Sequence, residues 1–262
     1  MTPQMLTFNI ISLSLIVIIC VVLRCTVKDH KGKVAALRVF AWLTFLLHIS
    51  IMWETSLYNN ATGEAPRSVL YPLYHCNVVM YLLMVVAYLP QDKKAFKFLA
   101  PFVSLGGVLG GLLTTFTYMF PIWNDAGQFS YEQAKSTFSH ITMILACLWM
   151  LCGGMVKLRV KSIPSIIAML LLEGANGLIF NFLLTRSIKG QVIYADANAM
   201  WLRFPIIGDN KALMGYFIGI YAAVVFSLVC LIWELVAVAS ARKKGINEPY
   251  SWKKQAVADY ND

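Results

Sequence analysis

Long apolar stretches alternate with short polar segments along almost the whole chain. Seven of these stretches have about the 20 residues that a helix needs to cross the hydrocarbon core of a bilayer. They are predicted at residues 6–23, 35–58, 69–89, 98–120, 137–155, 163–184 and 213–238. The pattern therefore predicts an all-α, polytopic membrane bundle of about seven transmembrane helices. Residues 1–240 are expected to form one transmembrane domain, followed by a basic tail at residues 241–262.

The composition supports the bilayer as the solvent. Of the residues, 59% are hydrophobic and 13% are charged, whereas an average soluble domain is about half apolar and a quarter charged. The net charge of +9 does not indicate a nucleic-acid partner, because the basic residues lie in short segments between the apolar stretches. Membrane lipids are the expected partners, together with a lipid or small-molecule substrate.

The distribution of basic residues predicts the orientation. Sixteen of the 22 Lys and Arg residues lie in the first, third and fifth connections and in the C-terminal tail. These segments share one side of a seven-span protein, and the side that is richer in Lys and Arg faces the cytoplasm. The N-terminus is therefore predicted outside and the C-terminus in the cytoplasm. The first apolar stretch lacks a basic region before it and a cleavage site after it, so it is interpreted as a true span.

Six cysteines fall in or beside the apolar stretches, without a CxxC motif or a framework spacing. Neither a disulfide scaffold nor a metal site is expected from them, and no cofactor is predicted. Within the fourth stretch, the glycines at positions 106, 107, 110 and 111 form two overlapping GxxxG pairs, which predict close packing against neighbouring helices. The longest outer segment, residues 185–211, is either a lid over the bundle or a solvated loop.

Polar side chains inside the spans are costly, and they are the best indicators of function. Cys76 is expected two turns below the outer end of the third span, with His75 beside it. His140 is expected one turn inside the fifth span, His48 deeper in the second, and Glu54 close to the outer surface. These five residues are therefore predicted to share the outer half of the bilayer.

Two further acids differ from this group. Glu173 is predicted near the middle of the sixth span, with Asn176 about one turn further on, and it is interpreted as part of a polar cavity. Glu234 lies near the cytoplasmic end of the last span, where it can reach the interface and pair with a basic neighbour. A structural role is therefore predicted for Glu234.

Cys76 and His140 are candidates for a nucleophile and its base, because a thiol in an apolar pocket needs an adjacent imidazole to become a thiolate. Glu54 or Glu173 is then a candidate to orient the histidine. The competing interpretation is that Cys76 is a small apolar packing residue, as buried free cysteines commonly are.

Residues 71–76 read Tyr-Pro-Leu-Tyr-His-Cys, which resembles the Leu-Pro-Leu-His-Leu-Cys signature of YwaF-like integral membrane proteins. His140 at the outer start of the fifth span is similar to that family's lone histidine there. The segment Asn-Ala-Met-Trp-Leu, which begins at Asn198, is similar to the family's Asn-Tyr-Met-Tyr-Leu. That family in turn resembles a transmembrane acyltransferase of ether phospholipids and, more distantly, the androgen-induced fatty-ester hydrolases.

The resemblance implies that Cys76 is the acyl-accepting thiol and His140 the general base. His75 directly precedes Cys76, whereas the histidine of the signature lies two positions before the cysteine, where this chain has Tyr74. On a helix this moves the imidazole by about 100°. His75 is therefore not expected to replace the signature histidine. The resemblance also implies a bacterial cell membrane as the location.

The leading hypothesis is a lipid-modifying enzyme, a phospholipid acyltransferase or an ester hydrolase, that uses Cys76 and His140 near the outer leaflet. Asn77 or Asn176 is the candidate to donate a hydrogen bond to the oxyanion. One alternative is a transporter or binding protein whose polar cavity contains Glu173, Asn176 and His48. Another alternative is an inactive scaffold on the same fold.

Overall fold

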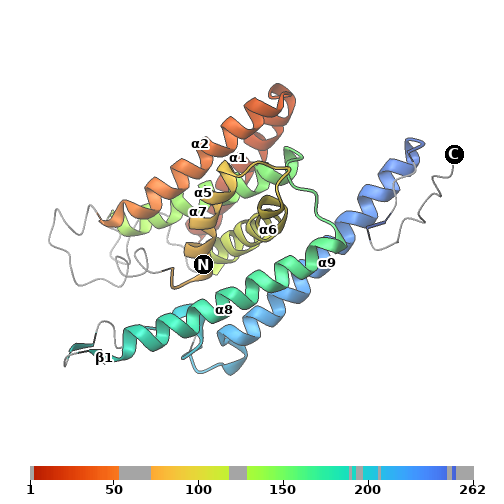
Figure 1. Ribbon diagram of the computed structural model, residues 1–262. Coiled ribbons are helices and arrows are strands. Elements are labelled where there is room, and N and C mark those ends of the chain that lie inside the picture. The colour runs from red at the N-terminus through yellow and green to blue at the C-terminus, as the bar shows by residue number, and fades with distance from the viewer. Residues whose placement is uncertain are drawn as a thin grey trace, which may run out of the picture.

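The computed structural model describes residues 3–52, 72–117, 129–188, 191–192, 197–205, 208–246 and 250–251. In this part of the chain the α-helices are α1 (Pro3–Thr26), α2 (His30–Ile49), α5 (His75–Tyr88), α6 (Lys94–Thr117), α7 (Tyr131–Cys152), α8 (Ile163–Thr185) and α9 (Gly215–Lys243). Six of them are long and apolar enough to cross a membrane, and α5 is a shorter apolar helix. The predicted all-α membrane architecture is confirmed (Figure 1).

Short elements lie between the long helices. Three 3₁₀ turns are η1 (Val160–Ser162), η2 (Ala199–Trp201) and η3 (Lys211–Leu213). Strands β1 (Ser187–Ile188) and β2 (Gln191–Val192) pair in antiparallel fashion, with Ser187 opposite Val192. These elements belong to the connections and leave the helical class unchanged.

The helices form two groups. Helix α7 packs against α1, α2 and α6, and α5 packs against α2 and α6, so these five helices share one apolar core. Trp149 of α7 is fully buried in this core, and its indole N–H donates to the carbonyl of Lys33 at 3.0 Å. Helices α8 and α9 run side by side next to this group (Figure 1). Helix α8 packs on α6, and side chains of both α8 and α9 extend the same apolar core.

Helix α8 buries a single stripe of side chains, at positions 166, 169, 173, 177, 181 and 184. The spacing of three or four residues keeps this stripe on one face of a helix. Large apolar residues such as Leu171, Leu178 and Phe182 are exposed on the other face, where a membrane would cover them. The stripe places Glu173 on the inward face of α8, at the middle of the helix as predicted.

Two helices begin earlier than the hydrophobic pattern predicts, because polar side chains cap their first turns. Helix α2 begins at His30 and not at residue 35, and the Asp29 carboxylate accepts a hydrogen bond from the Gly32 N–H at 2.7 Å. Helix α7 begins at Tyr131 and not at residue 137, after Ser130, whose side chain accepts from the backbone of position 133. Capping satisfies first-turn N–H groups that hydropathy alone does not register.

Helix α5 begins later than the predicted span 69–89. Its first residue is His75, and Tyr74 before it is extended, with φ −122° and ψ 156°. The carbonyl of Leu73 accepts a hydrogen bond from Met200 of η2, so this backbone pairs with another segment and not with its own helix. Cys76 therefore lies in the first turn of α5, which corrects the expected depth of two turns inside the helix.

The predicted close packing of the glycines in α6 is confirmed. A Cβ atom on Gly106 would lie 2.9 Å from the His75 ring, and one on Gly110 would lie 2.7 Å from it. Gly107 and Gly111 face the side chains of α7 at similarly close range. The two pairs of glycines therefore serve different neighbours. One pair admits a histidine ring from α5, and the other brings the backbone of α6 close to α7.

Glu234 has the structural role predicted for it. Its side chain is fully buried and accepts hydrogen bonds from the Val160 N–H at 2.7 Å, from the Ser251 hydroxyl at 2.7 Å and from the Ser251 N–H. The guanidinium of Arg159 lies 3.7 Å from it. The carboxylate of this α9 residue therefore hydrogen-bonds to two other segments. One is the connection before α8, and the other is the segment after α9.

Substituting Glu234→Gln is expected to lower the free energy of unfolding by about 3 kcal/mol. The reason is that the NH₂ group of glutamine would face buried N–H donors in place of an accepting oxygen. Thermal melting of the purified protein in detergent, followed by near-ultraviolet circular dichroism, measures this. The control Ser251→Ala removes only one hydroxyl donor and is expected to cost about 1 kcal/mol. Equal melting temperatures for Glu234→Gln and the wild type would contradict the assigned role.

Candidate functional site

Polar side chains gather on two sides of α5, near its first residue. On one side, Cys76 and Asn77 face polar residues of α2 and α7 inside the five-helix group. On another side, His75 reaches α6 and α8. Consecutive residues of a helix point about 100° apart, so one turn of α5 supplies both groups.

The first group, which we call the thiol cluster, consists of His48, Cys76, Asn77, Lys135 and His140. The Cys76 thiol donates to the side-chain oxygen Oδ1 of Asn77 at 3.4 Å, and the side-chain nitrogen Nδ2 of Asn77 lies 3.5 Å from Nε2 of His48. His48 in turn interacts electrostatically with Lys135 and His140. Cys76 is partly exposed, whereas the other four side chains are buried. The predicted candidates from three helices are therefore brought into one polar region.

The hydrogen bonds of His140 fix its tautomer. Its Nδ1 lies 2.7 Å from the carbonyl oxygen of Ser136, which only accepts, so Nδ1 must carry a proton and donate it. In a neutral ring Nε2 then has a free lone pair. This Nε2 is buried and has no hydrogen-bond partner among the described residues, although the residue is only 6% exposed. His140 therefore holds an unused basic nitrogen in the protein interior.

Lys135 is the member of the thiol cluster that the hydrophobic pattern missed. It precedes the predicted fifth span, but α7 begins early enough to include it, and its side chain is only 8% exposed. It interacts electrostatically with Cys76, His48 and His140. The pattern Ser-x-x-Gln at residues 130–133 is a helix-start signal that would have revealed the longer helix. The cluster thus contains a buried lysine that interacts electrostatically with the thiol.

The second group centres on an ion pair between His75 and Glu173. The Nδ1 of His75 lies 2.9 and 3.1 Å from the two carboxylate oxygens, and its Nε2 donates to the Gly106 carbonyl at 3.2 Å. The ring meets Phe102 edge to face. Because both nitrogens face oxygens, Nε2 carries a proton and a further proton is shared between Nδ1 and the carboxylate. The pair as a whole is neutral in either arrangement of that proton.

Asn176 and Asn198 both form hydrogen bonds from their side chains to the backbone of connecting segments. The Asn176 amide donates to the Pro72 carbonyl at 2.9 Å and so ties the segment before α5 to α8. Asn198 closes its own loop, donating to Phe204 O and accepting from the N–H groups of Arg203 and Phe204. Asn176 thus lies with the ion pair and not in the thiol cluster.

Part of the segment between α8 and α9 packs onto the helix ends. Met200 donates to Leu73 through its backbone, and the Trp201 ring stacks on Tyr74 with a centroid distance of 5.1 Å. Asn181 of α8 bonds both the N–H and the carbonyl of Ala199. The described residues 197–201 therefore cover the beginning of α5 and the end of α8. Glu54 and residues 193–196 lie outside the described residues.

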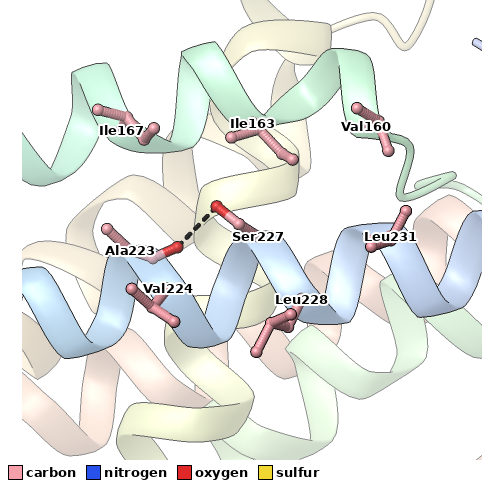
Figure 2. A pocket seen from close by; sticks show the side chains of 8 residues that line it. All are labelled: Val160, Ile163, Ile167, Ala223, Val224, Ser227, Leu228 and Leu231. Carbon is pink, nitrogen blue, oxygen red and sulfur yellow. Dashed lines mark hydrogen bonds between the residues drawn. The ribbon is translucent and has the colours of Figure 1, made fainter. Parts of the chain in front are cut away.

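Grooves lie between α5 and α8 and between α8 and α9. One, of about 430 Å³, lies between α5 and α8 and includes Glu173, Asn176 and Tyr81. Val78 and Leu82 also line it, and Cys76 lies about 200° around the helix from Val78, so the thiol faces away from this groove. The other, of about 440 Å³, lies between α8 and α9 and is almost entirely apolar (Figure 2). In the described ranges, no three His, Cys, Asp or Glu side chains are arranged to hold a metal ion.

Comparison with known families gives one match. The family model of the TMEM164 family matches residues 1–237. This range includes all the described α-helices except the last turns of α9. No curated protein and no solved structure matches the chain.

Proposed function

The chain belongs to the TMEM164 family and is an integral membrane protein, and from this premise we propose that it modifies membrane lipids by acyl transfer or ester hydrolysis at the thiol cluster. Cys76 is the proposed nucleophile and His140 the proposed base. Lys135 and the first turn of α5 supply positive potential for the anionic intermediate.

The unused Nε2 of His140 carries the proposal. A buried histidine normally satisfies both ring nitrogens, since an unpaired buried polar atom is costly. Here Nδ1 is fixed by the Ser136 carbonyl, so Nε2 is held ready to accept a proton. In thiol enzymes an imidazole oriented in this way activates the nucleophile, and we propose that Nε2 of His140 does so for the Cys76 thiol.

The chemistry balances without a cofactor. The Cys76 sulfur attacks the carbonyl carbon of a phospholipid ester, and its proton passes to His140. The ester bond then breaks, the lysophospholipid hydroxyl leaves with the proton from His140, and the acyl chain remains on Cys76 as a thioester. The hydroxyl of a second lysophospholipid, or water, attacks the thioester and restores the thiol. Attack by the lysophospholipid gives acyl transfer, and attack by water gives hydrolysis.

Labelling of the protein in nanodiscs with an alkyne-bearing long-chain acyl thioester tests the proposal. The expected result is one acyl group on Cys76, located by mass spectrometry after proteolysis. Substituting His140→Ala is expected to slow this labelling by about 100-fold or more, because the thiol loses its base. The exposed Cys25 at the end of α1 is the internal control for nonspecific acylation. Acylation spread evenly over both cysteines would refute an activated thiol.

The ion pair favours a second candidate function. His75 and Glu173 share a proton inside the membrane, and Glu173 borders the groove between α5 and α8, as expected for a proton-linked transporter. Solute or proton flux in proteoliposomes that is lost in Glu173→Gln, but unchanged in Cys76→Ala, would favour transport. Acyl exchange lost only in Cys76→Ala would favour the enzyme.

A further inference from the structure

The groove between α8 and α9 is a separate feature of the fold, which we call the seam. It is lined by Val160, Ile163, Ile167, Ala223, Val224, Ser227, Leu228 and Leu231 (Figure 2). The one polar side chain, Ser227, donates its hydroxyl to the carbonyl of Ala223 at 2.7 Å. The seam therefore presents only apolar surface to an occupant, and it shares no lining residue with the thiol cluster.

The dimensions of the seam suit a hydrocarbon chain. Its lining on α9 runs from Ala223 to Leu231, and the rise between these two residues corresponds to about 12 Å of helix. Its volume of about 440 Å³ lies within the range of ordinary ligand sites. Because the neighbouring faces of α8 and α9 carry exposed apolar residues, the occupant reaches the seam directly from the bilayer.

One end of the seam is basic. Val160 lines this end, and the flanking Lys157 and Lys161 are both exposed. Among the described residues the acid at this end is Glu234, which is fully buried and already accepts hydrogen bonds from Val160 and Ser251, with Arg159 beside it. The two exposed lysines thus lie on either side, in the sequence, of a residue that lines the apolar groove, while the Glu234 carboxylate is already hydrogen-bonded.

We propose that the seam binds one acyl chain of an anionic phospholipid, whose headgroup lies against Lys157 and Lys161. Basic side chains at the end of an apolar groove between membrane helices match the two parts of such a lipid. A zwitterionic lipid would fill the groove equally well but gains less from the lysines. This site is independent of the acyl-transfer proposal, because no residue of the thiol cluster contributes to it.

Native mass spectrometry of the purified protein tests the site, with phosphatidylglycerol and phosphatidylcholine of identical acyl chains as probes. The wild type is expected to retain phosphatidylglycerol about 10- to 30-fold more strongly, which corresponds to two lysines near a headgroup. The double variant Lys157→Gln, Lys161→Gln is expected to lose this preference. The matched control Lys93→Gln, Lys94→Gln removes two exposed lysines at the start of α6 and is expected to keep this preference.

Two further variants test the groove itself. Ser227→Phe fills the seam from α9 and Ile167→Trp fills it from α8, and each is expected to reduce retention of both lipids by about tenfold, because a filled groove excludes the acyl chain. Both residues line the seam and neither belongs to the thiol cluster. Equal retention of the two lipids by the wild type would overturn the proposal. An equal loss in the control pair, or unchanged retention in both filled variants, would also overturn it.

Discussion

Substituting Cys76→Ala is expected to abolish acyl exchange between phospholipid and lysophospholipid in nanodiscs, with a loss on the order of 1,000-fold or more. The reason is that the proposed reaction passes through a thioester on this sulfur, and no step can begin without it. The measurement is transfer of a labelled acyl chain to an added lysophospholipid. His140→Ala is expected to lower the same rate by about 100- to 10,000-fold, as the loss of a general base does.

The double variant distinguishes the loss of a shared catalytic step from a general loss of structure. If Cys76 and His140 act in one step, the double variant should be no slower than Cys76→Ala alone, because residues that act as a unit are non-additive. Cys25→Ala is the matched control, since it removes an exposed thiol at the end of α1 and should leave the rate unchanged. Exchange that continues in the double variant would exclude this mechanism.

The sequence predicts the membrane architecture well because the bilayer imposes a strong, local constraint. A helix that spans the bilayer needs an apolar stretch of about 20 residues. Such a stretch can be recognised in the sequence without knowing which helices pack against it. The inward position of Glu173 and the structural role of Glu234 follow from the same argument, as the cost of burying a charge is a property of position in the span. The orientation of the termini stays a prediction from the basic residues.

The details of the candidate site depend on contacts between distant segments, which the pattern does not contain. Helix α5 begins at His75 because Leu73 pairs with Met200, more than a hundred residues away in the sequence. Lys135 enters the thiol cluster because α7 is extended by a capped turn. Neither feature is visible in the hydropathy of the third or fifth span.

The partner of His75 is likewise set by tertiary packing. The histidine next to Cys76 is directed away from the thiol cluster, because the small residues Gly106 and Gly110 leave room for its ring between α5 and α6. Glu173 then meets it from α8. The GxxxG pairs predicted that some side of α6 is closely packed. They did not predict that a charged pair would occupy the space, which joins three helices at one point.

Substituting Glu173→Leu is expected to lower the free energy of unfolding by about 3 kcal/mol, and His75→Leu by a similar amount, because each leaves a buried polar partner unpaired. The double variant His75→Leu, Glu173→Leu is expected to be less destabilised than either single variant, since removing both members eliminates the unpaired group. Glu173→Gln keeps a side chain that can donate to Nδ1 of His75, and it is expected to cost only about 1 kcal/mol. Thermal melting in detergent measures all four. Strictly additive losses in the double variant would mean that the two residues stabilise the bundle independently, and the pair would then not be what joins α5 to α8.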